Sequence, residues 1–391
     1  MMDVVQMLGV MLGGFFAHPL LYIGVVAIFV MSLHRVSKER ASFHTRVLAK
    51  RADMIIPFLP SLVMGVLISL VTVSLGVVLP FSALLLLLFG YVLMVATAQV
   101  HVMSPVYALG STLVAIVVLD GASVPGWLEV STEVVPGLFL LLALLLVAES
   151  LLILKNGPAF TSPQLERGKR GKWIGVHLAK RLWILPVVLF IPEGLIPAAG
   201  YWPVFSLGET SFQPLLVPFL IGFQMKKRSA PPQEAIRTYG HRSLGFALLA
   251  LALACTYVAW PVPWLLVVMV LVLLGVRVTM TLLPMLTERT KTAFFTESRE
   301  GCTIVGVIPG SPAAKMNLKP GEQIVKVNGL RVSSEENFYA ALQQNAVYCK
   351  LDVRDLEGEI RFEQGALYAG QHHQVGVLLV RTETKLSNSV V

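Results

Sequence analysis

The sequence predicts an α-helical polytopic membrane domain with about eight or nine spans, residues 1–286, followed by a small α+β domain, residues 287–391. Three observations lead to this fold class. The chain is 55% hydrophobic and only 14% charged, whereas soluble domains carry about 25% charged residues. Uncharged runs long enough to cross a bilayer fill the chain up to Pro284. After that residue, charged and apolar residues mix as they do in a water-soluble fold.

Nine apolar runs are candidate spans, because about 20 apolar residues form a helix that crosses the hydrocarbon core. They are Phe15–Leu33, Ile55–Leu79, Phe81–Ala98, Pro105–Leu119, Val134–Leu154, Trp183–Gly200, Phe212–Gln224, Leu244–Trp260 and Val262–Leu283. The run Phe212–Gln224 is the weakest, since it is short and contains Pro214 and Pro218. The stretch before Phe16 lacks the basic start of a secretory signal peptide, so the first run is expected to be retained.

Three basic stretches, 34–51, 155–181 and 225–242, separate the apolar runs. Short loops rich in Lys and Arg stay in the cytoplasm, so all three are predicted to be cytoplasmic. Loops on one side are separated by an even number of crossings, which requires Phe212–Gln224 to cross. The same count places the N-terminus outside and everything after Leu283 in the cytoplasm. Membrane orientation accounts for the net charge of +8, and no aromatic-interleaved basic surface indicates nucleic-acid binding.

Two ionisable residues lie inside apolar runs, Glu149 and Arg277. Such residues are costly in a bilayer and are functional candidates. One hypothesis is that they pair and fasten two helices at a similar depth. The alternative is that each side chain snorkels to the interface. A transporter would show polar residues along several spans or matched broken helices in two halves, and neither pattern is evident.

From Gly301 onward the pattern changes to short strands and turns, with β-branched runs and Gly, Pro and Asn between them. The expected elements are a strand at Gly301–Ile308, a short helix at Ala313–Leu318, a strand at Gln323–Val327, a hairpin turn at Asn328-Gly329, a helix from Ser334 to Gln344, and paired strands at Tyr348–Val353 and Glu359–Glu363.

Three motifs in this order resemble the core signature of bacterial PDZ domains. They are Val307-Ile308-Pro309-Gly310-Ser311-Pro312-Ala313-Ala314, Leu318-Lys319-Pro320-Gly321-Glu322-Gln323-Ile324 and Val327-Asn328-Gly329. The chain departs from the signature at Asn317, where Gly is common, and at Glu322, where Asp is common. The resemblance implies a fold that binds an extended peptide as an added strand and often holds its C-terminal carboxylate with backbone amides.

Mapped onto this sequence, the resemblance implies a peptide-binding groove with three parts. The loop of Ser298, Arg299, Glu300 and Gly301 would supply the amides, the strand of Cys302, Thr303, Ile304 and Val305 would accept the peptide, and Phe338, Ala341 and Leu342 would line the apolar side. The alternative is a blocked groove that serves only for packing, with Phe338 in the core.

No enzyme motif accompanies this domain. None of the eight histidines forms His-Glu-x-x-His, the zinc motif of intramembrane metalloproteases, and no Gly-x-Ser-x-Gly elbow or P-loop occurs. No room remains between the last span and the PDZ-like region for a serine-protease domain. Cys255, Cys302 and Cys349 fit neither a zinc site nor a disulfide framework. The sequence therefore predicts a protein without enzyme activity, metal or cofactor.

The layout of many spans followed by one PDZ domain resembles the MinJ family, cell-division topology proteins of rod-shaped Gram-positive bacteria. The start is also similar, with His18-Pro19-Leu20, an apolar span and the basic stretch His34–Arg40. The resemblance implies a membrane scaffold that bridges the pole protein DivIVA to the ATPase MinD at septum and poles. Its partners would be these proteins, a peptide in the PDZ groove and the lipid bilayer. The alternative is a transporter-like or protease-regulating membrane protein whose PDZ domain senses a peptide.

Overall fold

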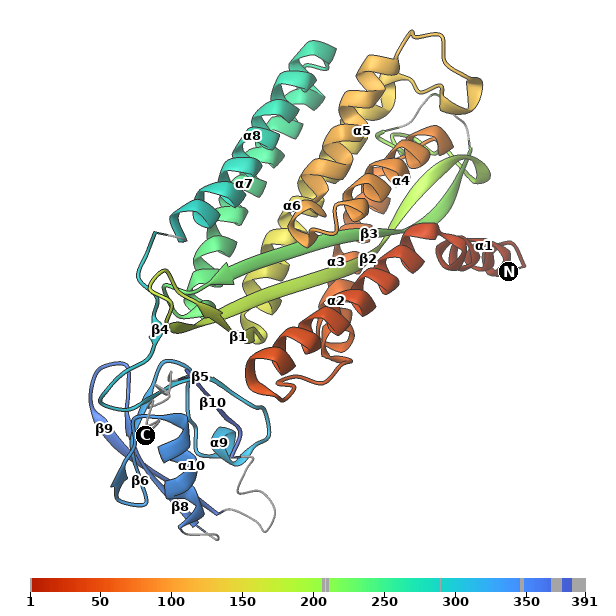
Figure 1. Cartoon of the computed structure of the whole chain (residues 1–391). Coiled ribbons are helices and arrows are strands. Elements are labelled where there is room, and N and C mark those ends of the chain that lie inside the picture. Colours follow the sequence, from red (N-terminus) through yellow and green to blue (C-terminus); the bar gives the residue numbers. More distant parts are fainter. Residues whose placement is uncertain are drawn as a thin grey trace.

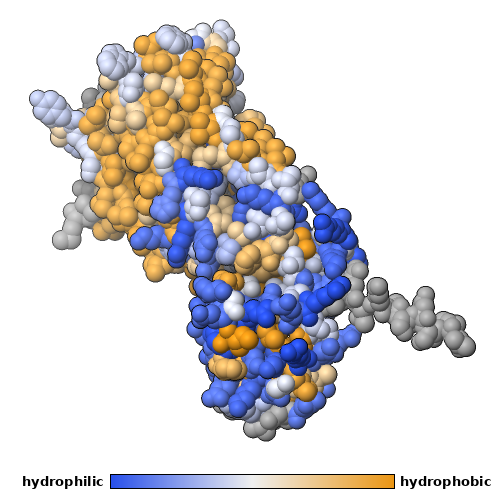
Figure 2. Space-filling view, turned by 90° about the vertical axis from the view of Figure 1, so that its left-hand side faces the viewer, coloured by the Kyte–Doolittle hydropathy of each residue, from blue (hydrophilic) through white to orange (hydrophobic). Residues whose placement is uncertain are grey.

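The computed structural model describes residues 2–205, 208, 211–288, 290–344, 348–366 and 375–381. It divides into a helical membrane part and a β-rich C-terminal domain, drawn in blue at the bottom of Figure 1. The visible face of the membrane part is largely apolar, whereas the C-terminal domain is mostly hydrophilic (Figure 2). This difference is the one that the charge distribution of the sequence predicted. We call the end of the membrane part that contacts the C-terminal domain the docking end, and the opposite end the distal end.

Eight α-helices form the described membrane part. They are α1 (Met2–Ala17), α2 (Pro19–Phe43), α3 (Ala52–Leu75), α4 (Phe81–Ala96), α5 (Pro105–Leu119), α6 (Val135–Asn156), α7 (Pro232–Ala259) and α8 (Pro263–Glu288). Seven of the nine predicted runs are confirmed as helices α2 to α8. Among the described residues, five helices are long and apolar enough to cross a membrane, and three apolar helices are shorter. The break between α1 and α2 follows from Pro19 at the first helical position and His18, whose Nδ1 accepts the Leu20 N–H.

The prediction of helical spans at Trp183–Gly200 and Phe212–Gln224 is wrong. These residues form two long antiparallel strands, β2 (Trp173–Pro197) and β3 (Ser211–Lys227), paired from His177–Lys227 to Pro197–Ser211. The hairpin runs diagonally through the helices (Figure 1). At about 3.3 Å per residue, β3 is roughly 55 Å long. It therefore exceeds the roughly 30 Å thickness of a hydrocarbon core.

The prolines that made Phe212–Gln224 a poor helix fit the hairpin. The N–H groups of Val188 and Phe190 bond outside the hairpin, so even-numbered residues of β2 turn their backbone groups outward. By the register, even-numbered residues of β3 do the same. All four prolines within the regular pairing are even-numbered: Pro186, Pro192, Pro214 and Pro218. Since proline has no N–H to give to the ladder, it is tolerated at such positions.

The outward backbone groups of β2 are satisfied by α3 and the chain that follows it. Val188 N–H donates to Ser69 Oγ at 2.9 Å, and its carbonyl accepts from Thr72 Oγ1 at 2.7 Å. Phe190 exchanges two backbone bonds with Val77 and Leu79. Away from water, each unpaired group would cost several kcal/mol, so an open hairpin needs such partners at membrane depth. Helix α3 and the residues that directly follow it supply them.

Strand β3 is approached by the short 3₁₀ helix Val100–Val102, which joins α4 to α5. Gly222 N–H donates to the Met103 carbonyl at 2.7 Å. A Cβ on Gly222 would lie 2.0 Å from the Val100 carbonyl oxygen. Glycine is therefore required here by the close approach of two backbones.

The hypothesis of a Glu149–Arg277 pair is confirmed. Arg277 Nη2 donates to Glu149 Oε1 at 2.5 Å, and the Ser104 hydroxyl donates to Glu149 Oε2 at 2.7 Å. The exposed fractions are 0% for Glu149 and 1% for Arg277, so neither side chain snorkels to a surface. The pair links α6 to α8, and the hydrogen bond from Ser104 links the start of α5 to the same carboxylate.

The three basic stretches meet at the docking end. His44, just after α2, contacts Arg381 of the C-terminal domain. Strand β1 (Ser162–Arg167) and the start of β2 lie beside that domain, and Lys227 at the end of β3 pairs with Glu288 at the end of α8. The loop count and the structure thus agree that these stretches share one end with the C-terminal domain. Their cytoplasmic location stays a prediction.

The C-terminal domain has two helices and seven described strands. They are β4 (Phe295–Thr296), β5 (Cys302–Val307), α9 (Pro312–Lys315), β6 (Gln323–Val327), β7 (Leu330–Arg331), α10 (Glu335–Gln343), β8 (Tyr348–Arg354), β9 (Ile360–Ala366) and β10 (Val377–Leu379). Each element predicted here from the sequence is confirmed within a few residues. The Asn328-Gly329 turn joins β6 to β7, with positive φ at both residues.

Candidate functional site

The C-terminal domain is built on a sheet with strand order β10-β5-β6-β8-β9, to which β7 adds beside β6. Its core combines side chains of the sheet with those of α9 and α10. Asn317, where bacterial PDZ domains commonly have Gly, has a φ of 52°. Asn adopts this left-handed conformation more readily than most residues, so the departure is accommodated. Glu322 is buried and accepts two hydrogen bonds from Arg361 and one from the Lys319 N–H.

The predicted amide loop, Ser298 to Gly301, joins β4 to β5 and packs against β6. A Cβ on Gly301 would lie 2.8 Å from the Ile324 carbonyl oxygen, so this glycine permits the contact. Ser298 Oγ accepts the Glu300 N–H, and Glu300 pairs with Arg354 on the surface. Arg299 is exposed. The loop's polar groups are thus partly engaged within the domain.

The predicted accepting strand, Cys302 to Val305, is paired along both edges. Cys302 and Thr303 pair with β6, and Ile304 pairs with β10. A free edge is needed to add a peptide strand. In the described residues, the strand at this end of the sheet is β10, and β5 lies inside the sheet. The predicted strand therefore has no open edge here, because β10 lies beside it.

The three predicted groove side chains on α10 face the domain core. Phe338 and Leu342 are 0% exposed and Ala341 is 3% exposed. They pack in one cluster with Val377 and Leu379 of β10. The sequence left open whether Phe338 lines a groove or lies in the core, and the structure places it in the core. It also brings α10 and β10 to the same core.

Cys302 does not act as an exposed nucleophile in this arrangement. Its thiol donates to the Ser334 carbonyl at 3.4 Å, and burial raises the pKa of Cys302 to about 12. Burial likewise raises the pKa of Cys349 to about 12. In the part of the chain that the structure describes, no three His, Cys, Asp or Glu residues gather closely enough to hold a metal ion.

The C-terminal domain packs against the docking end through one face of its β5–β10 pair. Strand β4 extends the membrane part's sheet by pairing with β2 at Ile174 and Gly175. Val305 and Val380 form a buried cluster with Leu165 and Phe295. Leu378 packs on the loop after α2. The sequence had predicted two bodies, and the structure joins them through a shared apolar interface.

His177 bridges the two parts. Its Nε2 donates to the Val305 carbonyl at 2.8 Å, because a carbonyl only accepts, and its Nδ1 then accepts from Thr161 Oγ1 at 2.8 Å. Burial lowers the pKa of His177 to about 4. The imidazole is therefore neutral at physiological pH, in the tautomer that this bridge requires.

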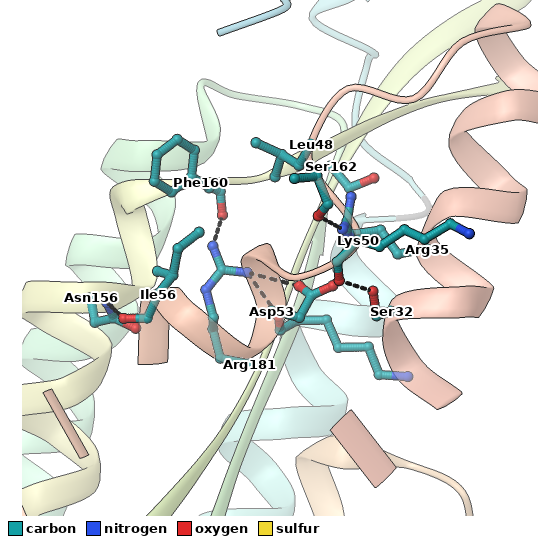
Figure 3. Close-up of polar contacts among 12 residues, drawn as sticks. Ser32, Arg35, Leu48, Lys50, Asp53, Ile56, Asn156, Phe160, Ser162 and Arg181 are labelled. Carbon is teal, nitrogen blue, oxygen red and sulfur yellow. Dashed lines mark hydrogen bonds and ion pairs between the residues drawn. The ribbon is translucent and has the colours of Figure 1, made fainter. Parts of the chain in front are cut away.

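Beneath this interface lies a buried cluster of charged residues (Figure 3). Arg35 of α2 donates to Asp53 of α3 at 2.7 Å and to Glu39 at 2.8 Å. Glu39 also accepts from Ser162 of β1 at 2.9 Å. Arg181 of β2 lies 4.0 Å from Asp53 and donates to the Phe160 carbonyl. The cluster ties α2, α3, β1 and β2 together directly under the C-terminal domain.

Sequence reasoning missed His177 and this cluster, although two signals were present. Asp53 is a lone acid at the start of an apolar run, and Arg35 and Glu39 are four residues apart on one helix. No comparable signal marked His177, whose partners lie 16 and 128 residues away in the chain.

Comparison with known proteins agrees with this architecture. Residues 303–353 match the family described as PDZ domain. Over its length the chain is similar to the cell division topological determinant MinJ of Bacillus subtilis (strain 168), with 31% identity over 376 residues, 95% of this chain and 94% of that protein. The chain belongs to the MinJ family. Another member, the probable cell division topological determinant MinJ of Lacticaseibacillus paracasei, is 26% identical over 383 residues, 90% of this chain and 93% of that protein.

Membership of the MinJ family confirms the resemblance drawn from the sequence, including its PDZ domain. The relatives are named as division determinants, and a PDZ domain is an interaction module. Together with the apolar helices, this makes the chain a membrane protein of cell division whose partners are proteins.

Proposed function

We propose that this MinJ-family chain is a membrane scaffold that performs no chemistry and uses no cofactor. It would recruit division-placement proteins, bridging a DivIVA-like protein to a MinD-like protein at septum and poles. The observation that carries the proposal is the packing of the PDZ domain onto the end of the membrane part where the basic stretches gather. By the positive-inside rule this end faces the cytoplasm, where both partners would act.

The mechanism is recruitment to a surface. Tethering a binding module to a membrane converts later encounters into local ones and raises the effective concentration of its partners. The membrane part then acts as an anchor, and its buried Glu149–Arg277 pair and long hairpin hold the docking end in shape.

The outer edge of β10 is the proposed peptide-binding edge of the PDZ domain. It is the end strand of the described sheet and shares a core cluster with α10. A peptide added there would continue the order β10-β5-β6 outward, by the mode in which PDZ domains add a strand. Strand β5, which the sequence predicts to accept the peptide, would then lie behind β10 and support it.

A fluorescent fusion tests the scaffold in cells. The full chain is expressed in a rod-shaped Gram-positive bacterium that lacks its own MinJ-family protein. We expect label at septum and poles and restoration of normal cell length. Uniform membrane label without restored cell length would contradict the division role and favour a transporter-like or protease-regulating protein.

A binding assay tests the partners. The full chain in lipid nanodiscs is mixed with a purified DivIVA-like or MinD-like protein, and binding is compared with that of a chain truncated after Glu288. We expect at least one partner to require the PDZ domain. Equal binding of both partners to the truncated chain would show that the PDZ domain is not the recruiting module.

A further inference from the structure

A pocket of about 70 Å³ lies at the docking end, next to the charged cluster of Figure 3. Its volume is that of roughly two water molecules at about 30 Å³ each, enough for a compact polyatomic ion. Its polar lining comes from α2, the start of α3, β1 and β2, and consists of His34, Arg35, Lys38, Asp53, Ser162, Gln164, Lys180 and Arg181. Four of these eight side chains are Lys or Arg and one is acidic.

The acids of this region are already paired. Asp53 accepts from Arg35 and faces Arg181. Glu39, behind the pocket, accepts from Arg35, from the Ser162 hydroxyl and from the Val47 N–H. Both carboxylates near the pocket are therefore already engaged by donors of the protein, and the four Lys and Arg side chains of the lining outnumber them.

The remaining donors are unpaired. Gln164 Nε2 and Arg181 Nε are buried and have no hydrogen-bond partner among the described residues. Both residues are more than nine-tenths buried. Within the same described part of the chain, no hydrogen bond or ion pair engages the ammonium groups of Lys38 or Lys180. A buried donor without a partner is unfavourable, so a group that accepts from these donors is favoured there.

The residues of α2 around the pocket pass from apolar to basic. Phe29, Val30 and Leu33 of α2 are exposed apolar residues within about two turns before its basic stretch. Lys38 follows on the same helix and is exposed at the pocket. Apolar surface thus gives way to cationic surface at this level, which is the level where phospholipid phosphates lie. Basic pockets between membrane helices are suited to anionic headgroups.

We propose that this pocket binds the phosphate group of an anionic phospholipid. Lys38 and Lys180 supply charge at the pocket, and Gln164 and Arg181 donate from its buried wall. The small volume admits the phosphate alone, so the acyl chains stay outside along α2. A free phosphate ion has the same chemistry, but the position beside the lipid-facing residues of α2 favours the lipid as its source.

The test measures lipid binding to the full chain by native mass spectrometry, with phosphatidylglycerol titrated into detergent micelles. The double variant Lys38→Gln/Lys180→Gln removes two charges that make no hydrogen bond or ion pair among the described residues and keeps side chains of similar length, so we expect its fold to be retained. We expect its affinity for phosphatidylglycerol to fall about 30-fold, about fivefold for each lysine. Phosphatidylcholine, which is zwitterionic, is expected to bind weakly to both proteins.

The matched control is Lys155→Gln/Lys169→Gln, which removes the same charge from exposed positions of another basic stretch. We expect it to change the affinity by less than about threefold, since exposed charges are screened. If both double variants lose the same affinity for phosphatidylglycerol, or if neither loses any, the pocket is not the lipid-binding site. Inorganic phosphate is also titrated into the full chain in phosphatidylcholine micelles. If it binds as tightly as phosphatidylglycerol does, and if Lys38→Gln/Lys180→Gln weakens this binding, the ligand is free phosphate and the proposal of a lipid is wrong.

Discussion

The hairpin β2–β3 of the membrane part and the hairpin β8–β9 of the PDZ domain share a topology but differ in surroundings. Strand β8 alternates between buried and half-exposed residues, and β9 is exposed along one face. From His177 to Phe190 of β2 and from Ser211 to Met225 of β3, every residue is buried or half-buried, because helices cover the hairpin. A two-residue period appears in a sequence only when one face of a strand meets water. It is therefore visible in the second hairpin and absent from the first.

The difference predicts that an added methyl group destabilises the membrane hairpin much more than the hairpin of the PDZ domain. Gly222→Ala places a Cβ 2.0 Å from the Val100 carbonyl oxygen, a backbone atom that cannot move aside. We expect the full chain to lose more than about 4 kcal/mol of stability in detergent. The control is Gly365→Ala of β9, where the nearest atoms belong to the flexible Met316 side chain, and we expect a loss within about 1 kcal/mol. Equal losses would mean that the 3₁₀ helix does not approach β3.

An aromatic residue in each hairpin gives the second comparison. Phe219 of β3 is 0% exposed and Phe362 of β9 is 79% exposed. We expect Phe219→Ala to cost about 3–5 kcal/mol through a buried cavity, and Phe362→Ala to change stability by no more than about 0.5 kcal/mol. Thermal unfolding of the purified full chain measures both. A large loss at Phe362 would reveal a partner on β9 that the isolated chain does not show.

Proline scanning sharpens the register of β2–β3. Val217→Pro removes an N–H that points toward β2, so we expect a loss of about 3 kcal/mol or more. Leu216→Pro places the ring on the outward side, in phase with Pro214 and Pro218, and its loss should be smaller by about 2 kcal/mol. The reverse order would show that the register is shifted by one residue.

The smallest expected effect is a pH dependence where the two regions meet. The pKa of His177 is about 4 in the docked state and about 6.5 for an exposed histidine. Between these values the undocked state binds more protons, so docking weakens as the pH falls from 6.5 toward 4. At pH 5.5 we expect the free energy of docking to be smaller by roughly 1–1.5 kcal/mol. Faster hydrogen exchange at the amides of β4 and β5 measures this change. His177→Gln should remove this dependence, and its persistence would assign it to another group.

The PDZ domain could be predicted closely because its signals are local. Turn residues such as Asn328 and Gly329, and the helix cap at Ser334, act over a few positions and specify their elements directly. Its peptide-binding strand could not be located in the same way. Strand β10 pairs with β5 across 70 to 75 residues of sequence, and no local pattern indicates which edge of the sheet it occupies.

The division between membrane part and PDZ domain was determined by the sequence alone, because hydropathy and charge distinguish residues solvated by lipid from those solvated by water. Loop charges also grouped the three basic stretches at one end, and two lone charges suggested a Glu149–Arg277 pair, which the structure then confirmed. Only the tertiary structure decided that two apolar, proline-containing runs are strands. A run of apolar residues indicates that a segment is buried, but it does not indicate whether the segment is a helix or a strand. The hairpin is stable among the helices because Ser69, Thr72 and the chain after α3 form hydrogen bonds with its outward backbone groups.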